Sequence, residues 1–226
     1  MKLNRPEGSK TFGTFYETPL ENTMNDLQQI LAISSSHHTH LCPRQVLGAR
    51  IGLVGASALG LELPRNDKRL VIIIETDGCF ADGIEAATGC SVGHRTLRVE
   101  DYGKIAATFI DVKTEQTLRI TPKLDSRQRA LAYAPNESRH YFAQLQAYQI
   151  MPDDELLNFQ HVRLRVPIQD IVSRAGVRVN CAYCGEEIIN EREIISDGES
   201  LCRACATDGY YHQPVELYPS LQHQMV

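Results

Sequence analysis

LVIIIETDGCFADGIEAATGC, residues 70–90, is the stretch that decides the fold. Its first seven residues form an apolar run bounded by charge, which predicts a central strand covered on both faces. The Asp77-Gly78 pair follows this strand. A short helix is then expected near residues 80–88, with a glycine on each side. The remaining elements are predicted outward from this strand and helix.

Two helices are expected before the strand. Residues 21–34 place apolar side chains at helical spacing, which predicts an amphipathic helix. Pro43 suits the first turn of the next helix, because the N–H that proline lacks is not needed there. This second helix, to about Gly60, is rich in Gly and Ala. Glycine costs helix stability, so close packing of a neighbouring backbone is the expected compensation.

Further strands and helices are expected after residue 90. The predicted strands are 97–99, 104–112 and 117–121, and the predicted helices are 125–132, 138–150 and a short one from Pro152. Residues 162–168 are either a half-exposed strand or an extended connector, and 170–178 are a hinge. We therefore divide the chain into an arm (1–20), a core domain (21–168) and a C-terminal zinc-finger domain with a tail (169–226).

Composition narrows the class of protein. The 226 residues are 42% hydrophobic and 23% charged, as in ordinary globular proteins, and the net charge is −5. This charge argues against a strong non-specific nucleic-acid binder, so direct nucleic-acid binding is not expected. No apolar segment follows the charged start, and the apolar stretch after Pro43 is interrupted by Arg50. We expect a cytoplasmic protein without a membrane span.

Four of the seven cysteines form two Cys-x2-Cys pairs near the C-terminus. They are Cys181, Cys184, Cys202 and Cys205. Two such pairs on two tight turns provide four thiolates for a tetrahedral Zn²⁺, and Gly185 suits the first turn. Asp197-Gly198 between the pairs predicts a two-residue hairpin turn. A segment this short buries little core, so a structural zinc would supply much of its folding energy.

This C-terminal segment, CAYCGEEIINEREIISDGESLCRAC, resembles the zinc finger of the DksA/TraR group. The resemblance lies in Cys-x2-Cys-Gly-Glu, in Ile188 and Arg192, and in the spacing of the second pair. It implies a small treble-clef or zinc-ribbon-like domain. The polymerase-directed activity of that group is not implied, because it depends on a long coiled coil that this chain lacks.

Two segments of the first half combine His, Cys and Asp. Cys42 precedes a helix, and Cys79 follows the buried strand, at the kinds of position where α/β folds place chemistry. A helix N-terminus also favours thiolate. The candidate residues are His38, His40, Cys42, Asp77, Cys79, Asp82 and Cys90. Imidazole and thiolate together suit a transition metal. Buried structural cysteines and solvated histidines are the other interpretation, and spacing alone leaves both open.

The two segments together, HTHLCP and TDGCFADGIEAATGCSVG, resemble the FmdE family of formylmethanofuran dehydrogenase over residues 20–165. The resemblance implies an α+β core, a mixed sheet packed with helices, which is usually dimeric and has a cleft that can hold a metal. Thr39, Arg44, Ser91 and His94 depart from the family pattern. These departures bear on the ligand set and on any substrate preference more than on the fold.

Three hypotheses for function follow. In the first, a metal-binding accessory or redox-associated subunit works beside a one-carbon (formyl or formate) oxidoreductase. Its core metal (Zn, Fe or Ni) is held by His38, His40, Cys42 and Cys79, with Asp82 and Cys90 in support. In the second, the core senses a small molecule or metal, and the zinc finger contacts a partner. In the third, the chain is a thiol enzyme with Cys42 or Cys79 as nucleophile; Asp77 is a further candidate catalytic residue. Whether the chain is itself an enzyme stays open.

Overall fold

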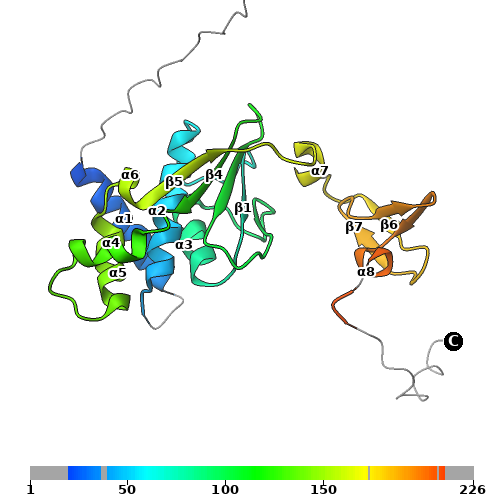
Figure 1. The fold of residues 1–226 in the computed structure, drawn as a ribbon. Helices are drawn as coiled ribbons and strands as arrows, with labels where there is room; N and C mark the ends of the chain where they lie inside the picture. The colour runs from blue at the N-terminus through cyan, green and yellow to red at the C-terminus, as the bar shows by residue number, and fades with distance from the viewer. Residues whose placement is uncertain (1–19, 37–39, 173, 208, 212–226) are drawn as a thin grey trace, which may run out of the picture. The chain divides into compact units, whose positions relative to one another are not determined.

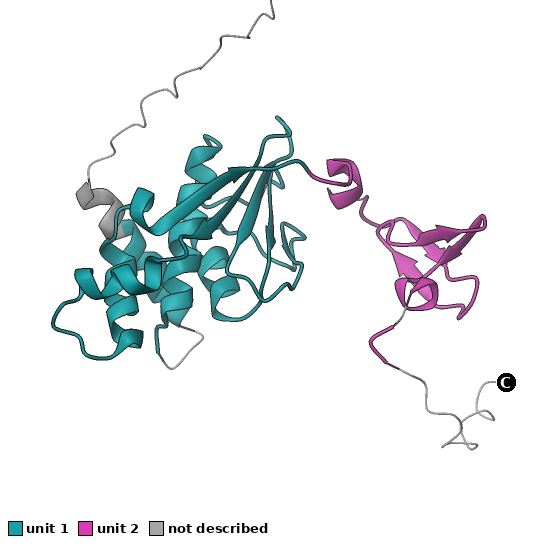
Figure 2. Ribbon diagram, viewed as in Figure 1, with its two compact units in different colours: residues 1–163 teal, residues 164–226 magenta. Residues whose placement is uncertain are grey.

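The computed structural model describes residues 20–36, 40–172, 174–207 and 209–211, with side chains from residue 26 onward. The chain divides into two compact units, residues 1–163 and 164–226 (Figure 2). Each unit is described by itself below. Within the described residues, no helix has the length and apolar character needed to cross a membrane.

A five-stranded mixed sheet forms the centre of unit 1 (Figure 1). In the order in which they pair, the strands are β2 (Leu97–Val99), β1 (Leu70–Ile74), β3 (Ala107–Asp111), β4 (Thr117–Pro122) and β5 (Leu157–His161). The β1–β2 pair is parallel and the other pairs are antiparallel. The predicted mixed sheet is therefore confirmed, and β1 is an interior strand with four of its five residues buried.

Helices pack on this sheet around α2. Unit 1 contains α1 (Leu20–Ser35), α2 (Pro43–Ala58), α3 (Cys79–Thr88), α4 (Ser126–Tyr133), α5 (His140–Ile150) and the short α6 (Asp153–Leu156). Helix α2 contacts α1, α3 and α5 as well as β3 and β4. Alternate strand residues such as Ile72, Phe109 and Ile120 join the same core as Val46 and Ile51 of α2. The apolar stretch after Pro43 is thus a buried helix of the core.

Glycines let α2 and α3 approach at backbone distance. A Cβ placed on Gly48 would lie 2.3 Å from the Phe80 carbonyl oxygen, and one on Gly83 would lie 2.2 Å from the Gln45 carbonyl oxygen. Farther along both helices, a Cβ on Gly52 would lie 2.8 Å from that of Ala87. The close packing predicted for this helix is confirmed. Because the contacts advance along both helices together, α2 and α3 run parallel.

Arg50 interrupts the apolar α2 for a structural reason. Its guanidinium donates to the carbonyl oxygens of Tyr148 (2.8 Å) and Met151 (2.7 Å) at the C-terminal end of α5. It also pairs with Asp153 at 2.6 Å. The last carbonyls of a helix lack partners inside the helix, so Arg50 satisfies them and favours the negative end of the helix dipole.

Two segments of unit 1 and its neighbourhood differ from the prediction. Residues 157–161 form the edge strand β5, which the sequence did not indicate, because four of its five residues are exposed and give no apolar pattern. Residues 162–167 form a connector without strand structure. Helix α7 (Ile168–Val172) then occupies the start of the predicted hinge, with Ile168 and Ile171 buried.

Unit 2 consists, beyond α7, of two small hairpins and a helical turn. These elements are β6 (Arg178–Asn180), β7 (Glu187–Ile189), β8 (Ile194–Ser196), β9 (Glu199–Leu201) and α8 (Arg203–Ala206). Asp197 and Gly198 connect β8 to β9, both with positive φ, as the predicted two-residue turn requires. The arrangement agrees with the expected small zinc-finger domain.

Candidate functional site: a thiol pair and a four-cysteine cluster

Cys42 is held at the N-terminal end of α2 by a capping residue. The backbone N–H of Cys42 donates to the side-chain oxygen of Gln45 (2.8 Å), and the Gln45 amide donates to the Ser34 carbonyl oxygen (3.1 Å) at the end of α1. Gln45 is fully buried. One side chain therefore joins the end of α1 to the start of α2 and sets the position of Cys42.

Cys79 is placed by the turn that follows β1. Gly78 has φ +67° and ψ −148°, a conformation that only glycine adopts readily, and Cys79 is the first residue of α3. The Gly78 carbonyl accepts the N–H of Ala81 at 2.8 Å. The Asp-Gly-Cys sequence thus turns the chain sharply from the sheet into the helix and leaves the thiol at the helix N-terminus.

The parallel packing of α2 and α3 puts the two thiols side by side. Cys42 is buried and Cys79 is half-buried. Burial and the adjacent Cys42 thiol raise the pKa of Cys79, while the charge of Arg44 acts in the opposite direction. A raised pKa disfavours an unassisted thiolate at neutral pH, which weighs against Cys79 as a nucleophile acting alone.

Tyr141 and Arg44 are also part of this thiol site. The Tyr141 hydroxyl donates to the Leu41 carbonyl oxygen at 3.3 Å, next to Cys42. Burial raises the pKa of Tyr141; Cys42 and Cys79 raise it further, and Arg44 lowers it. Since Arg50 of α2 contacts the far end of α5, α5 runs parallel to α2. The N-terminal ends of α2, α3 and α5 therefore meet at the thiols.

The predicted site residues are only partly brought together. Asp82 lies in the first turn of α3, and its charge acts on Cys79. His40 and Asp77 are exposed, and His38 lies outside the described residues. Among the residues that the structure describes, no third His, Cys, Asp or Glu forms a metal-sized cluster with the two thiols.

Cys90 is not brought to the thiol pair. It follows α3, whereas Cys79 begins it, and a helix of ten residues rises about 15 Å. Its thiol is fully buried in the core and donates to the Leu70 carbonyl oxygen at 3.7 Å. At this position Cys90 acts as a small core residue rather than as a ligand.

Sequence reasoning missed Gln45 and Tyr141 and treated Arg44 only as a departure. The position of Gln45, three residues after the N-cap, is the signature of a capping box, so this residue could have been found. Tyr141 comes from a distant helix, and no spacing rule connects it to Cys42.

The four C-terminal cysteines form a compact cluster. Their ligand atoms all lie within 4.8 Å of one another. The Cys184 and Cys202 sulfurs are 3.9 Å apart, which matches the separation of about 3.8 Å expected around a tetrahedral metal with bonds of about 2.3 Å. Gly185 adopts φ +77° in the first turn, as predicted. The four residues have the chemistry and the spacing of a structural metal site.

The four thiols differ in how readily they ionise. Backbone N–H groups of Cys184 and Cys202 lower the pKa of Cys181 to about 6. The neighbouring Cys202 thiol raises the pKa of Cys205 to about 12, and the pKa of Cys184 is also raised. A metal that binds here must displace protons from the less acidic thiols, so its affinity falls as the pH falls.

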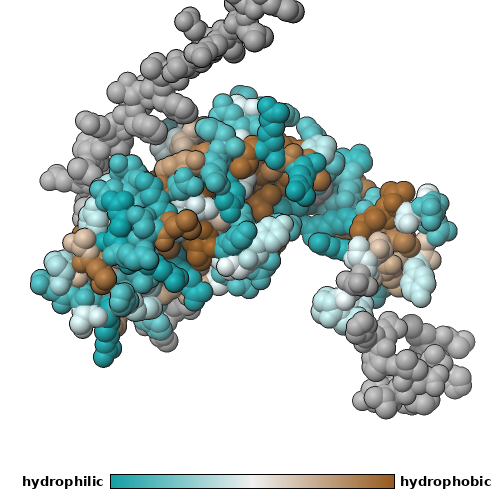
Figure 3. Space-filling view, in the orientation of Figure 1, coloured by the Kyte–Doolittle hydropathy of each residue, from teal (hydrophilic) through white to brown (hydrophobic). Residues whose placement is uncertain are grey.

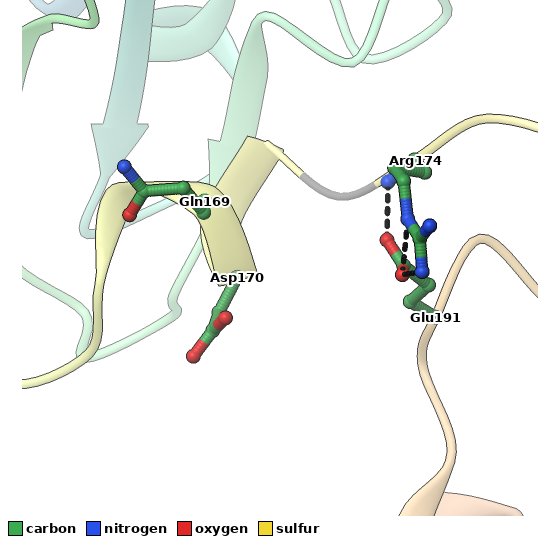
Figure 4. Close-up of a pocket in the computed structure, with 4 residues that line it drawn as sticks. All are labelled: Gln169, Asp170, Arg174 and Glu191. Atoms are coloured by element: carbon green, nitrogen blue, oxygen red, sulfur yellow. Dashed lines mark hydrogen bonds and ion pairs between the residues drawn. The ribbon is translucent and has the colours of Figure 1, made fainter.

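A shallow hollow in unit 2 is not a second candidate site. Gln169, Asp170, Arg174 and Glu191 line it (Figure 4). Both the Arg174 backbone N–H and its Nε donate to the Glu191 carboxylate at 2.6 Å. The charges that could bind a ligand therefore already neutralise each other.

Known proteins similar to this chain share unit 1 most clearly. A family model described as "FmdE, Molybdenum formylmethanofuran dehydrogenase operon" matches residues 37–160. A crystal structure of an FmdE-like protein (tungsten formylmethanofuran dehydrogenase) from Syntrophus aciditrophicus is similar in fold. Its TM-score is 0.51 and its identity 20%, over 82% of this chain and 95% of that chain.

A curated relative is a longer protein. The chain is 25% identical, over 224 residues, to a "Probable S-adenosyl-L-methionine-binding protein" of Archaeoglobus fulgidus. The match covers 90% of this chain and 58% of the relative.

Proposed function

Because the chain belongs to the FmdE family, we propose that it is a metal-binding accessory or redox-associated subunit that works beside a cytoplasmic one-carbon (formyl or formate) oxidoreductase. The observation that carries this proposal is the pairing of Cys42 and Cys79. These residues lie far apart in the sequence, and helix packing places them side by side. The S-adenosyl-L-methionine named for the archaeal relative is not part of the proposal, since the chain spans 58% of that protein.

The proposed core site uses both cysteines together with His38 and His40. Thiolate and imidazole donors suit Zn, Fe or Ni, and a bound metal would supply Lewis-acid or electron-transfer chemistry. Because burial and Cys42 raise the pKa of the Cys79 thiol, a metal that displaces its proton is the natural partner of this pair. Asp82, in the first turn of α3, would influence the ligands from outside the coordination sphere.

Elemental analysis of protein purified without chelator tests the core site. We expect close to two metals per chain in the wild type and one in the Cys42→Ser/Cys79→Ser variant. The matched control is Cys90→Ser, which removes a buried thiol at the other end of α3 and should leave two metals. One metal per chain in all three proteins would contradict the proposal.

The zinc finger supports a second candidate function, a regulatory or interaction module. Unit 2 exposes Tyr183, Ile195 and Tyr210 at 85%, 64% and 99%, and hydrophobic residues are visible on its surface (Figure 3). Exposed apolar groups of this kind commonly mark contacts with another protein. We propose zinc as the metal of Cys181, Cys184, Cys202 and Cys205. A metal count of one, unchanged in the Cys42/Cys79 variant, would make this second function the leading one.

A homodimer is a further proposal. The glycine-rich face of α2 packs on α3 and on Phe109 within the chain, so it does not supply an interface. Any dimer must use another surface, and light scattering on the purified protein measures its mass directly.

A further inference from the structure

Arg44 is the charged side chain placed to meet a ligand at the thiol pair. It stands in the first turn of α2, two residues after Cys42, and it is exposed. Its charge acts on both Cys79 and Tyr141. Tyr141 is 41% exposed, so the guanidinium and the phenol both reach solvent at the entrance to the thiols.

The backbone adds positive potential at the same place. The N-terminal ends of α2, α3 and α5 meet there, and each carries a partial positive charge from its unpaired N–H groups. The Asp82 carboxylate opposes this potential at Cys79, but it acts on that thiol less than Arg44 does. The balance of charge beside the thiol pair is therefore positive.

We propose that the thiol pair receives a small oxyanion, a carboxylate or a related group, and that the Arg44 guanidinium binds its negative charge. This inference rests on the proposed core site and identifies the class of molecule that enters it. The planar guanidinium offers paired N–H donors that match the two oxygens of a carboxylate. Arg44 is thus a specificity-determining residue for the ligand that approaches Cys79.

Competitive alkylation tests the charge preference. Iodoacetate and iodoacetamide both attach to a thiolate sulfur with loss of iodide, and they differ mainly in charge. The measured quantity is the ratio of their two adducts on Cys79, read by peptide mass spectrometry and divided by the same ratio for N-acetylcysteine in the same tube. Both reagents consume the same thiolate, so the ratio does not depend on how much thiolate is present.

The wild-type ratio is expected to exceed that of Arg44→Gln by roughly threefold to tenfold, the effect of one charge a few ångströms away in a wet site. Arg44→Lys should keep most of the preference. Arg127→Gln, which removes an equally exposed arginine from α4, should keep all of it. At about 1 M salt, where charges are screened within about 3 Å, the wild-type ratio should approach that of the variant.

An Arg44→Gln ratio equal to that of the wild type would overturn the inference. So would a loss of preference in Arg127→Gln as large as in Arg44→Gln. A metal held by the thiols slows both reagents together, so the absolute rate reports on the metal and the ratio reports on Arg44. Failure of the core metal site and failure of the anion preference are therefore seen separately.

Discussion

At the scale of single residues, buried polar side chains hold the sheet in register. Asp111, which is 1% exposed, accepts hydrogen bonds from Arg69 Nε (3.0 Å) and Nη2 (2.9 Å) where β1 and β3 pair. It also accepts the Lys113 N–H and the Thr114 hydroxyl, each at 2.9 Å. Because β1 leads directly into Cys79, this carboxylate stabilises the strand that positions the thiol.

The Asp111→Asn variant should lower the free energy of unfolding at pH 7 by about 2 kcal/mol, because the buried ion pair is lost while Arg69 keeps some access to water. Urea unfolding followed by circular dichroism measures the change. The exposed Asp67→Asn variant, which removes the partner of Arg65 at the surface, is the control and should have little effect.

The same variant makes a prediction about pH. The Arg69 guanidinium holds the pKa of Asp111 well below its usual range. A carboxyl group with a lowered folded-state pKa stabilises the fold above its unfolded-state pKa of about 3.9, and this contribution is lost as the pH falls below it. The difference between wild type and Asp111→Asn should therefore be full above about pH 5 and shrink toward pH 3. A difference independent of pH would contradict the assignment.

At the scale of elements, glycine on α2 and α3 determines how closely the two cysteines lie. A helix ordinarily gains stability when alanine replaces glycine. Here each added Cβ would meet backbone atoms of the facing helix. Backbone atoms cannot move aside as a flexible side chain can, so the helices would have to separate.

Gly83→Ala should therefore lower the free energy of unfolding by about 1–3 kcal/mol, the usual cost of overpacking, despite the better helix propensity of alanine. Thermal unfolding measures this change. Gly93→Ala, which adds a Cβ in open space, is the matched control and should be close to neutral. An unchanged or raised stability of Gly83→Ala would show that the two helices do not pack as described.

At the scale of the whole molecule, the two units depend on different sources of stability. Unit 1 has one extensive hydrophobic core that joins the helices to the sheet. In the described part of unit 2, the buried apolar residues are Ile168, Ile171, Cys181 and Ile188. So few buried side chains do not offset the conformational entropy of ordering the chain, so a metal is needed there.

Removal of the metal should unfold the finger and leave unit 1 folded. Peptide-resolved hydrogen exchange in the presence of a chelator should show lost protection for amides such as Ala182, which donates to Ser200 at 2.8 Å, while the amides of α2 and α3 stay protected. Cys181→Ser/Cys184→Ser should reproduce the pattern without chelator. Equal loss of protection in both units would contradict independent stability.

The sequence by itself determined the features that depend on neighbouring residues. The helices and strands with clear apolar periodicity, the turn at Asp197-Gly198 and the four-cysteine cluster are of this kind, because a Cys-x2-Cys pair already lies on one turn. The edge strand β5 was not predicted, because exposed residues carry no burial pattern.

Only the tertiary structure decided what meets at the thiol site. Cys42, Cys79 and Tyr141 come from three helices, and their meeting depends on the packing of Gly48 against Gly83 and on the parallel course of α5. The same geometry sent Cys90 away, although it lies near Cys79 in the sequence. Spacing along the chain determines distance only within one element; between elements, distance is determined by which faces pack together.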